Sequence, residues 1–255
     1  MNFEKLENKR VLVTAGAQGI GEAISRHFIE AGAHLAIHYF SSDTVATSLV
    51  ELAESRGLRA VAVQGDLCKR EDAEKVAAKV EDALGGLDVL VNNAGSLMGR
   101  RELSDIEDAF WRSVWDVNLT SNFLITQAVL DLLVANENSS IVNLSSLAGR
   151  KGGHAGSVVY SAAKGGILTW SRSLATELGP KGVRVNAIAP GLILGTSFHN
   201  THTTEESAAA TIASLPLARA GTPDDVARAV LFLASEYDGF ISGATLDING
   251  GVYGC

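Results

Sequence analysis

Residues 10–21 of the chain read RVLVTAGAQGIG, and residues 22–32 continue with EAISRHFIEAG. This stretch predicts a short apolar strand, a tight turn that contains glycines, and an amphipathic helix that ends at a glycine. The next apolar run, at residues 33–39, completes a strand–helix–strand unit. Such a turn lets backbone N–H groups approach a pyrophosphate, and the N-terminus of the helix favours its negative charge. The unit indicates dinucleotide binding, against the alternative of an ordinary turn that needs small residues for packing.

The rest of the chain repeats this alternation of strands and helices. Further apolar strand candidates are Leu58–Gln64, Leu87–Asn92, Ser140–Ser145, Val183–Ile188 and Ala244–Ile248. Helical patterns include Lys69–Leu84, Asp105–Ala135, Val158–Leu178 and Pro223–Ser235. Strands made almost wholly of Val, Leu and Ile that alternate with helices indicate a parallel sheet covered on both faces. We therefore predict an α/β protein, with one doubly wound, Rossmann-like domain over residues 1–255 and a mostly seven-stranded parallel sheet.

Polar residues and glycines gather where the predicted strands end. They are Thr14 and the glycines after the first strand, Asp66 after the third, Asn92–Gly95 after the fourth, Ser145 and Ser146 after the fifth, and Pro190–Gly191 after the sixth. Ligands of open parallel sheets bind beyond the carboxyl ends of the strands. Five strand ends that carry such residues to one edge predict a binding site there.

Tyr160 and Lys164 lie four residues apart in an alanine-rich run that favours a helix. Positions i and i+4 lie one above the other on a helix, so the ammonium can lie close to the phenol. A nearby positive charge favours the phenolate and lowers the pKa of tyrosine below its ordinary value of about 10. The pair is a candidate proton shuttle, although many surface helices carry these residues at this spacing for no chemical reason.

Taken in their order along the chain, these residues resemble the classical short-chain dehydrogenases/reductases over nearly the whole length. Thr14–Gly21 is similar to the cofactor turn Thr-Gly-x-x-x-Gly-x-Gly of that family, Asn92–Gly95 matches its Asn-Asn-Ala-Gly motif, and Pro190–Gly191 resembles the motif beside the nicotinamide. The resemblance implies an NAD(P)(H)-dependent oxidoreductase that interconverts a secondary alcohol and a ketone. The catalytic residues that it implies are Asn118, Ser146, Tyr160 and Lys164. The cofactor-binding residues that it implies are Thr14, Gly16, Gln18, Gly19, Ile20, Gly21, Tyr39, Ser41, Ser42, Asp66, Leu67, Asn93, Ala94, Gly95, Tyr160, Lys164, Pro190, Gly191, Ile193 and Thr196.

Each catalytic side chain has an expected task. Tyr160 exchanges a proton with the substrate oxygen, and the Ser146 hydroxyl positions that oxygen. Lys164 lowers the pKa of the tyrosine and, as the resemblance implies, holds the nicotinamide ribose. Asn118 anchors a water that links Lys164 to solvent. Two simpler interpretations stay open, namely Ser146 as a hydroxyl that caps a loop and Asn118 as a polar residue bonded within its own helix.

The chain departs from the family pattern at two places. Ala15 stands where the first glycine of the cofactor turn is usual, and alanine is small enough for the turn to form. Tyr160 lies fourteen residues after Ser146, one more than the commonest spacing. We expect residues 149–156, a glycine-rich loop, to absorb the extra residue, with Ser145 as the substitute for Ser146 if they do not.

The end of the second strand favours NADP over NAD. NAD enzymes with dinucleotide folds usually carry an acidic residue there, whereas this chain has Tyr39 and no carboxylate before Asp43. His38, Ser41 and Ser42 are candidate donors to a 2′-phosphate. Against NADP, Gln18 stands where many NADP-dependent relatives carry arginine, so NAD stays the second choice.

Composition argues against several other classes. The 255 residues include 21 basic and 29 acidic ones, for a net charge of −8, without a basic stripe, so we expect no nucleic-acid partner. Cys68 and Cys255 fit a reducing compartment, and with no membrane-spanning run or signal-peptide core we expect a cytoplasmic protein. His199 and His202 lack further ligands nearby, so we expect no metal site.

Residues 192–216 fit neither a plain strand nor a plain helix, and a short helix can start near Thr204. Family members use this region as a lid over the substrate, with a threonine near Thr196 at the nicotinamide amide. Leu97, Met98 and His154 are expected to shape the pocket. A 3-oxoacyl substrate and a sugar or polyol are equally favoured. A carrier-bound acyl substrate would need a basic patch, for which Arg150, Lys151, Lys181 and Arg184 are candidates.

The alternative from another class is a dinucleotide-binding regulator or scaffold without catalysis. A complete set of Asn118, Ser146, Tyr160 and Lys164 argues against it, because such a protein needs none of them.

Apolar residues on two long helices predict a homotetramer. They are Trp111, Trp115, Phe123, Leu124 and Leu130 on the first, and Ile167, Leu168 and Trp170 on the second. Family members pair these helices across a twofold axis and use the last strand and tail for a second interface, and two twofold interfaces give a closed tetramer. The alternative is that all these side chains belong to the core of one subunit.

Overall fold

The structure is a computed structural model that describes residues 6–196, 204–235 and 239–254. Seven strands form one parallel sheet in the order β3-β2-β1-β4-β5-β6-β7. They are β1 (Arg10–Val13), β2 (His34–Tyr39), β3 (Ala60–Gln64), β4 (Val89–Asn92), β5 (Ser139–Leu144), β6 (Val183–Pro190) and β7 (Thr245–Ile248). The strand order reverses between β1 and β4, and a crevice for a ligand forms beyond the carboxyl ends at such a point. The predicted α/β fold with a seven-stranded parallel sheet is confirmed.

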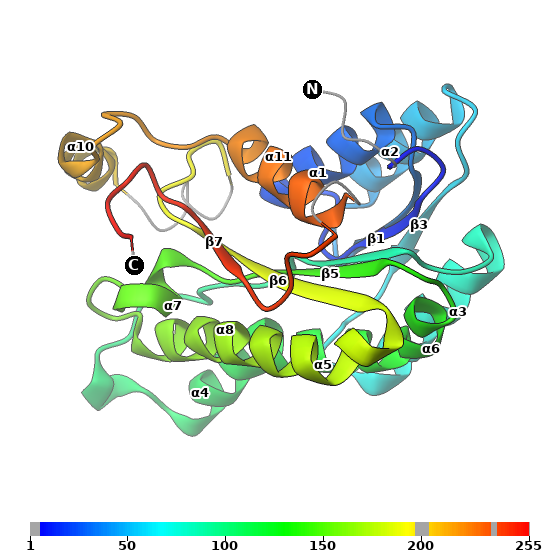
Figure 1. The fold of residues 1–255 in the computed structure, drawn as a ribbon. Coiled ribbons are helices and arrows are strands. Elements are labelled where there is room, and N and C mark those ends of the chain that lie inside the picture. The colour runs from blue at the N-terminus through cyan, green and yellow to red at the C-terminus, as the bar shows by residue number, and fades with distance from the viewer. Residues whose placement is uncertain (1–5, 197–203, 236–238, 255) are drawn as a thin grey trace.

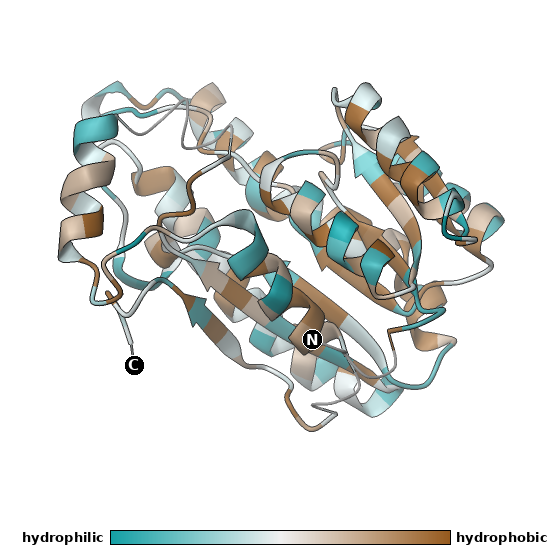
Figure 2. Ribbon diagram, turned by 90° about the horizontal axis from the view of Figure 1, so that it is seen from above, coloured by the Kyte–Doolittle hydropathy of each residue, from teal (hydrophilic) through white to brown (hydrophobic). Residues whose placement is uncertain are grey.

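Helices cover both faces of the sheet (Figure 1). On one face lie α1 (Gly19–Glu30), α2 (Asp43–Glu54) and α11 (Pro223–Ala234). On the other lie α3 (Arg70–Leu84), α5 (Ser121–Ala128), α6 (Leu130–Val134) and α8 (Val158–Leu178). Each layer buries apolar side chains against the strands, such as Phe28 and Val230 in the first and Val76 and Leu174 in the second. In Figure 2 the strands are mostly hydrophobic, whereas the helices carry both hydrophobic and hydrophilic residues.

The predicted single helix Asp105–Ala135 is wrong. It consists of a 3₁₀ turn (Leu103–Asp105), α4 (Asp108–Trp115), a π-helical turn (Asp116–Thr120), α5 and α6. Ile106 has an extended backbone, so α4 begins only after it. Val129, with φ −100° and ψ 6°, separates α5 from α6. The π turn contains Asn118, and such turns are frequent at functional sites.

The other predicted elements agree closely with the structure. The strand bounds differ by at most about two residues from those predicted, and α8 has the predicted bounds. The predicted helix start near Thr204 is confirmed, because α10 (Glu205–Ser214) begins there and Thr204 accepts the N–H of Ser207. We did not single out α2 or the short α7 (Leu147–Lys151), which occupies the first part of the predicted loop 149–156.

Three predictions fall outside the described residues, namely those for His199, His202 and Cys255. No helix within the described ranges is long and apolar enough to cross a membrane. The same ranges contain no group of three or more His, Cys, Asp or Glu side chains that could hold a metal ion.

Candidate active site

A cavity of about 440 Å³ opens at the carboxyl edge of the sheet. Its walls come from the segments that follow β1, β4, β5 and β6 and from α7, α8 and α10. Of the predicted site residues, those that line it are Gln18, Gly19, Ile20, Asn93, Gly95, Ser146, Tyr160, Lys164, Pro190, Gly191, Ile193 and Thr196. Those outside the lining are Thr14, Gly16, Gly21, Tyr39, Ser41, Ser42, Asp66, Leu67, Ala94 and Asn118. The structure therefore brings the reactive residues and much of the cofactor turn together in one place.

Hydrogen bonds connect the turn between β1 and α1 to the segment that follows β4. Thr14 Oγ1 accepts the N–H groups of Asn93 and Ala94, both at 2.9 Å, and Asn93 Nδ2 donates to the Thr14 carbonyl at 3.0 Å. Thr14 is buried, so it supports the turn rather than facing the cavity. No side chain caps α1. The N–H groups of its first turn therefore stay available as donors to an anion.

A buried histidine holds the first residue of this turn. His38 Nδ1 accepts the Ala15 N–H at 3.0 Å, and His38 Nε2 lies 3.0 Å from the carbonyl oxygen of Gly65. An amide N–H can only donate and a carbonyl can only accept, so the ring is neutral and carries its proton on Nε2. Burial lowers the pKa of His38, which favours the same neutral form. The prediction that His38 donates to a 2′-phosphate is wrong, because both of its ring nitrogens are occupied.

Ala15 adopts φ 48°, in the left-handed region that favours glycine. A residue with a Cβ loses roughly 1–2 kcal/mol in that region. Three contacts hold the strained residue in place. Besides the bond from Ala15 to His38, the Gly16 N–H donates to the His38 carbonyl at 2.8 Å and Asn93 Nδ2 donates to the Ala15 carbonyl at 3.2 Å. The turn thus forms with alanine in the position where glycine is usual.

The end of β2 presents hydroxyl groups beside the turn. Ser42 Oγ donates to Gln18 Oε1 at 3.4 Å, Ser41 is exposed, and Tyr39 is half-buried against the core. Asp43, the first carboxylate after the strand, accepts the N–H of Thr44 at 2.8 Å at the start of α2. The polar side chains between the end of β2 and Asp43, those of Ser41 and Ser42, are therefore neutral.

Asp66 and Leu67 follow β3 in a well-ordered turn. Asp66 Oδ1 accepts the Cys68 N–H at 3.1 Å, the Asp66 N–H donates to Asp72 Oδ2 at 3.0 Å, and Leu67 is buried. Burial and the neighbouring Asp66 charge raise the pKa of the Cys68 thiol to about 12. Cys68 therefore stays protonated and unreactive at neutral pH.

Tyr160 on α8 meets the serine that follows β5. Ser146 is the N-cap of α7, where its Oγ accepts the Ala148 N–H at 3.1 Å, and its hydroxyl hydrogen-bonds Tyr160. Ser145 instead donates to the Lys164 carbonyl at 2.7 Å and is buried. The structure therefore places Ser146, not Ser145, next to the phenol. The extra residue between Ser146 and Tyr160 is accommodated in α7 and the loop after it.

The Tyr160 phenol is protonated in this setting. Burial raises its pKa to about 12, which the hydrogen bond with Ser146 counteracts only in part. Lys164 Nζ lies 5.9 Å from the centre of the tyrosine ring and donates to the Leu144 carbonyl at 2.8 Å. Burial lowers the pKa of Lys164 to about 8. The expected lowering of the tyrosine pKa is wrong for this structure, because the loss of water around the phenol outweighs the lowering by the hydrogen bond with Ser146.

Asn118 is fully buried beneath the loop that follows β4. Its Oδ1 accepts the Ser96 N–H at 3.1 Å, and its Nδ2 donates to the carbonyls of Ser96 at 2.7 Å and Val114 at 2.8 Å. The bond to Val114 fits the simpler interpretation of Asn118 as a polar residue bonded within its own helix. The two bonds to Ser96 instead fix the loop that follows β4. A Cβ on Gly95 would lie 2.7 Å from Asn118 Oδ1 and 2.8 Å from Lys164 Nζ, so a glycine is needed there. Asn118 and Gly95 together make room for the lysine head group.

Two of the four predicted basic-patch residues are not available for a partner. Arg150 pairs with Asp247 through two bonds, of 3.0 and 2.7 Å. Arg184 is buried and donates to the carbonyls of Leu233 and Ser235, both at 2.9 Å. Both residues stabilise the fold, so the predicted patch of four basic residues is wrong. Of the four, only Lys151 lines the cavity.

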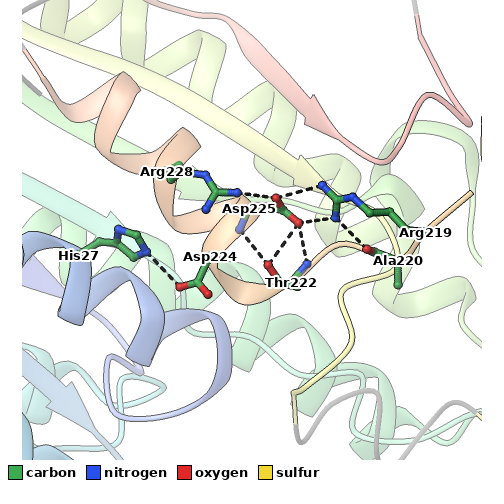
Figure 3. A network of polar contacts seen from close by, with 7 residues as sticks. All are labelled: His27, Arg219, Ala220, Thr222, Asp224, Asp225 and Arg228. Carbon is green, nitrogen blue, oxygen red and sulfur yellow. Dashed lines mark hydrogen bonds and ion pairs between the residues drawn. The ribbon is translucent and has the colours of Figure 1, made fainter. Parts of the chain in front are cut away.

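Polar contacts fix the chain where it leaves the cavity wall and enters α11 (Figure 3). The Asp225 carboxylate accepts from Arg219 Nη1 at 2.7 Å, Arg228 Nη2 at 2.6 Å and the Thr222 N–H at 2.9 Å. The hydrogen bond from Arg219 is the main reason why the pKa of Asp225 lies well below its usual range. The preceding Gly221 pairs with Ile193 of the cavity lining. This network anchors one end of the segment predicted as a lid.

Comparisons with known proteins agree with this geometry. A family model described as enoyl-(acyl carrier protein) reductase matches residues 14–253. The 3-oxoacyl-[acyl-carrier-protein] reductase FabG of Aquifex aeolicus is 37% identical over 253 residues, covering 98% of this chain and 99% of its own. A short-chain dehydrogenase from Burkholderia cenocepacia in complex with NADP has a TM-score of 0.90, 32% identity and coverage of 98% of this chain and 99% of its own. A short-chain dehydrogenase/reductase of Brucella melitensis, titled glucose/ribitol dehydrogenase, has a TM-score of 0.92, 32% identity and full coverage of both chains, 100% each.

Proposed function

Because the chain belongs to the short-chain dehydrogenase/reductase family, we propose that it is an NADPH-dependent reductase of ketones in which Tyr160 donates the proton. The observation that carries the proposal is the meeting of the Tyr160 phenol, the Ser146 hydroxyl and the Lys164 ammonium in one cavity beside the dinucleotide turn.

Tyr160 holds the proton that reduction of a ketone requires. With a pKa of about 12, the phenol holds its proton at neutral pH and can give it to the alkoxide oxygen that develops on the substrate. A bound nicotinamide cofactor supplies the hydride, which no protein side chain can supply. Ser146, hydrogen-bonded to Tyr160, orients the substrate oxygen next to the phenol.

Lys164 serves the tyrosine after the proton has moved. Its ammonium, 5.9 Å from the ring centre, stabilises the phenolate that Tyr160 becomes. The lysine is held by its bond to the Leu144 carbonyl. Its head group lies beside Gly95 and Asn118, where the missing side chain of Gly95 leaves space for it. A water held near Asn118, which returns a proton through Lys164, remains part of the proposal.

The dinucleotide turn fits a cofactor with phosphates. The uncapped first turn of α1, with Gly19 and Ile20 in the cavity wall, supplies N–H donors for a pyrophosphate. Tyr39, Ser41 and Ser42 would lie at the ribose 2′-position. Their neutral hydroxyls suit a 2′-phosphate better than an acidic side chain at this position would. The Burkholderia cenocepacia relative in complex with NADP supports this choice. NAD is the second choice, and titrations with both reduced cofactors distinguish them.

A 3-oxoacyl thioester is the substrate class that we propose first, on the strength of the Aquifex aeolicus relative. A sugar or polyol is the second candidate. The observation in its favour is a row of hydroxyls on α10, where Ser207, Thr211 and Ser214 line the cavity. The segment 192–216 that contains α10 is, in this proposal, the lid over the substrate.

We propose that the protein forms a tetramer and works in the cytoplasm, where the reduced cofactor is available. Among the apolar residues predicted for the interface, Leu124, Ile167 and Leu168 are buried within the subunit. Trp111 and Phe123, however, are 45% and 37% exposed, and they mark a face that a second subunit would cover. Light scattering that gives the mass of a single chain at micromolar concentration would overturn the tetramer.

A substrate panel followed through the absorbance of NADPH tests the proposed function. The panel contains 3-oxoacyl thioesters, 2-enoyl thioesters and simple ketoses with NADPH, and sugars and polyols with NADP⁺. We expect the fastest turnover with the 3-oxoacyl thioesters. Turnover of the enoyl thioesters alone would show that the double bond, and not the ketone, is the reacting group.

A further inference from the structure

Basic side chains gather at the mouth of the cavity. Arg100, Lys151 and His154 line it and are exposed, and we call these three residues the basic rim. The described residues that line the cavity include no aspartate or glutamate. This local excess of basic groups is opposite to the net charge of −8 of the whole chain. A cavity lined in this way attracts anions.

Arg100 and Lys151 of the basic rim lack the ion pairs that several other basic residues form. Arg10 pairs with Asp88, Arg150 with Asp247 and Arg219 with Asp225, at 2.7–2.8 Å. Within the described part of the chain, neither Arg100 nor Lys151 forms an ion pair. Arg150 and Lys151 are adjacent in the chain, yet Arg150 forms an ion pair with Asp247 and Lys151 forms none within the described residues. In a chain with more carboxylates than cations, an unpaired arginine and lysine at one cavity mouth are available for a ligand.

The two loops that carry the basic rim are built against each other. The Arg101 N–H donates to the Gly156 carbonyl at 2.9 Å, and Arg100 Nη1 donates to the Ala155 carbonyl at 3.1 Å. Gly156 has φ 75°, and a Cβ there would lie 2.9 Å from the Cβ of Arg100, so glycine permits this close approach. Ser157 Oγ closes the loop by donating to the His154 carbonyl at 2.5 Å. Arg100 is therefore held against the loop that carries His154, and within the described residues its other guanidinium N–H groups form no hydrogen bond.

The basic rim lies on the substrate side of the cavity. Arg100 follows β4, and Lys151 and His154 follow β5. The dinucleotide turn follows β1, and the residues proposed for the ribose 2′-position, Tyr39 to Ser42, lie at the end of β2. In the sheet, β2 and β1 lie on the other side of β4 from β5. Ser146 lies in the same segment as Lys151, because α7 connects them, and Tyr160 lies in the first turn of α8, which follows His154 in the chain. The basic rim is thus placed for a group attached to the substrate, not for the phosphates of the cofactor.

We propose that Arg100, Lys151 and His154 bind an anionic group, a phosphate or a carboxylate, that the ketone substrate carries away from its reacting carbonyl. The proposal rests on the proposed function for the position of the ketone at Tyr160. The contact between the basic rim and the anion is a separate interaction and can be measured without turnover.

The test uses the complex of the protein with NADP⁺, which cannot reduce a ketone. Calorimetric titrations compare 3-oxobutanoyl-phosphopantetheine with 3-oxobutanoyl-pantetheine, which differ only in the phosphate, and a keto acid with its methyl ester. For at least one pair, the anionic member should bind roughly tenfold more tightly at low salt. The pair that shows the preference identifies phosphate or carboxylate as the source of the charge. The preference should fall below about threefold in the double variant Arg100→Gln, Lys151→Gln and at high salt.

Lys181→Gln is the matched control, because Lys181 is an exposed lysine outside the cavity lining. It removes the same type of charge and should keep the preference. The proposal is overturned if both pairs bind equally to the unmodified protein, or if the preference survives in the double variant. Turnover of the neutral thioester with NADPH tests the proposed function separately. An anion preference without any turnover would support the basic rim and contradict the reductase.

Discussion

His38 Nδ1 accepts a hydrogen bond from the Ala15 N–H at 3.0 Å, and a buried imidazole thereby fixes the first residue of the dinucleotide turn. The other ring nitrogen is bonded to Gly65, just before Asp66. One side chain therefore connects the segments after β1 and β3, on both sides of β2. The contact requires an unprotonated Nδ1, so it depends on pH.

Replacing His38 should show this dependence. In His38→Asn, Oδ1 can take the place of Nδ1 and accept the Ala15 N–H, so NADPH affinity should stay within about threefold of the unmodified protein. In His38→Leu the buried N–H loses its partner, which costs about 1–3 kcal/mol, and affinity should fall roughly tenfold. Fluorescence titrations with NADPH measure both. Equal affinity of the leucine variant would show that the contact does not support the turn.

The stability of the protein should fall in mild acid because of the same residue. Burial lowers the pKa of His38, against the opposing effects of its bond to Gly65 and of the Asp66 charge. The unfolded chain, with the ordinary value of 6.5, then binds more protons than the folded one. The contribution of His38 is complete above about pH 6.5 and is lost as the pH falls toward the lower folded value. Denaturant unfolding at several pH values should show this loss, and the His38→Asn variant should lack it.

Ala15→Gly should stabilise the protein. The residue has φ 48°, and glycine adopts that angle without the strain that the alanine Cβ causes. Part of the gain is offset by the greater freedom of glycine in the unfolded chain, so we expect about 0.5–1 kcal/mol. Urea unfolding measures it, with Ala17→Gly as the control in the same turn. A less stable Ala15→Gly variant would mean that the turn imposes no strain.

Tyr39→Asp should shift the cofactor preference from NADPH toward NADH. A carboxylate at this position repels the 2′-phosphate and accepts hydrogen bonds from the free ribose hydroxyls. The ratio of kcat/KM with the two cofactors should change by about tenfold or more. Tyr39→Phe is the control, since it removes the hydroxyl without adding charge. Tighter binding of NADH than of NADPH to the unmodified protein would reverse our choice of cofactor.

Local patterns in the sequence were sufficient to predict the fold and the edge of the sheet at which the proposed reactive residues lie. The alternation of apolar runs and glycine-bearing turns predicted all seven strands, and the Tyr160–Lys164 helix has the predicted bounds. Both depend on interactions between residues that are close in the chain. The turn sequence around Gly19 and the strand ends are likewise local signals, and they lead to the correct edge of the sheet.

Long-range contacts explain what the sequence could not predict. His38 and Ala15 are 23 residues apart, and Arg150 and Asp247 are 97 apart, so neither pairing leaves a local pattern. The raised pKa of Tyr160 follows from burial, which depends on the assembled fold. The π turn contains Asn118, whose side chain bonds Ser96, 22 residues earlier in the chain. An unbroken apolar period could not reveal that turn.

The most direct test of the proposed reductase is the turnover of Tyr160→Phe with NADPH and the best substrate of the panel. The ring keeps its packing while the proton donor is lost, so we expect kcat to fall by about 10²-fold or more, with NADPH affinity unchanged within about twofold. Ser145→Ala, which removes a nearby hydroxyl that donates to the Lys164 carbonyl, serves as the matched control and should retain most of the activity. A Tyr160→Phe enzyme that turns over at the unmodified rate would contradict the assignment of the phenol as the proton donor.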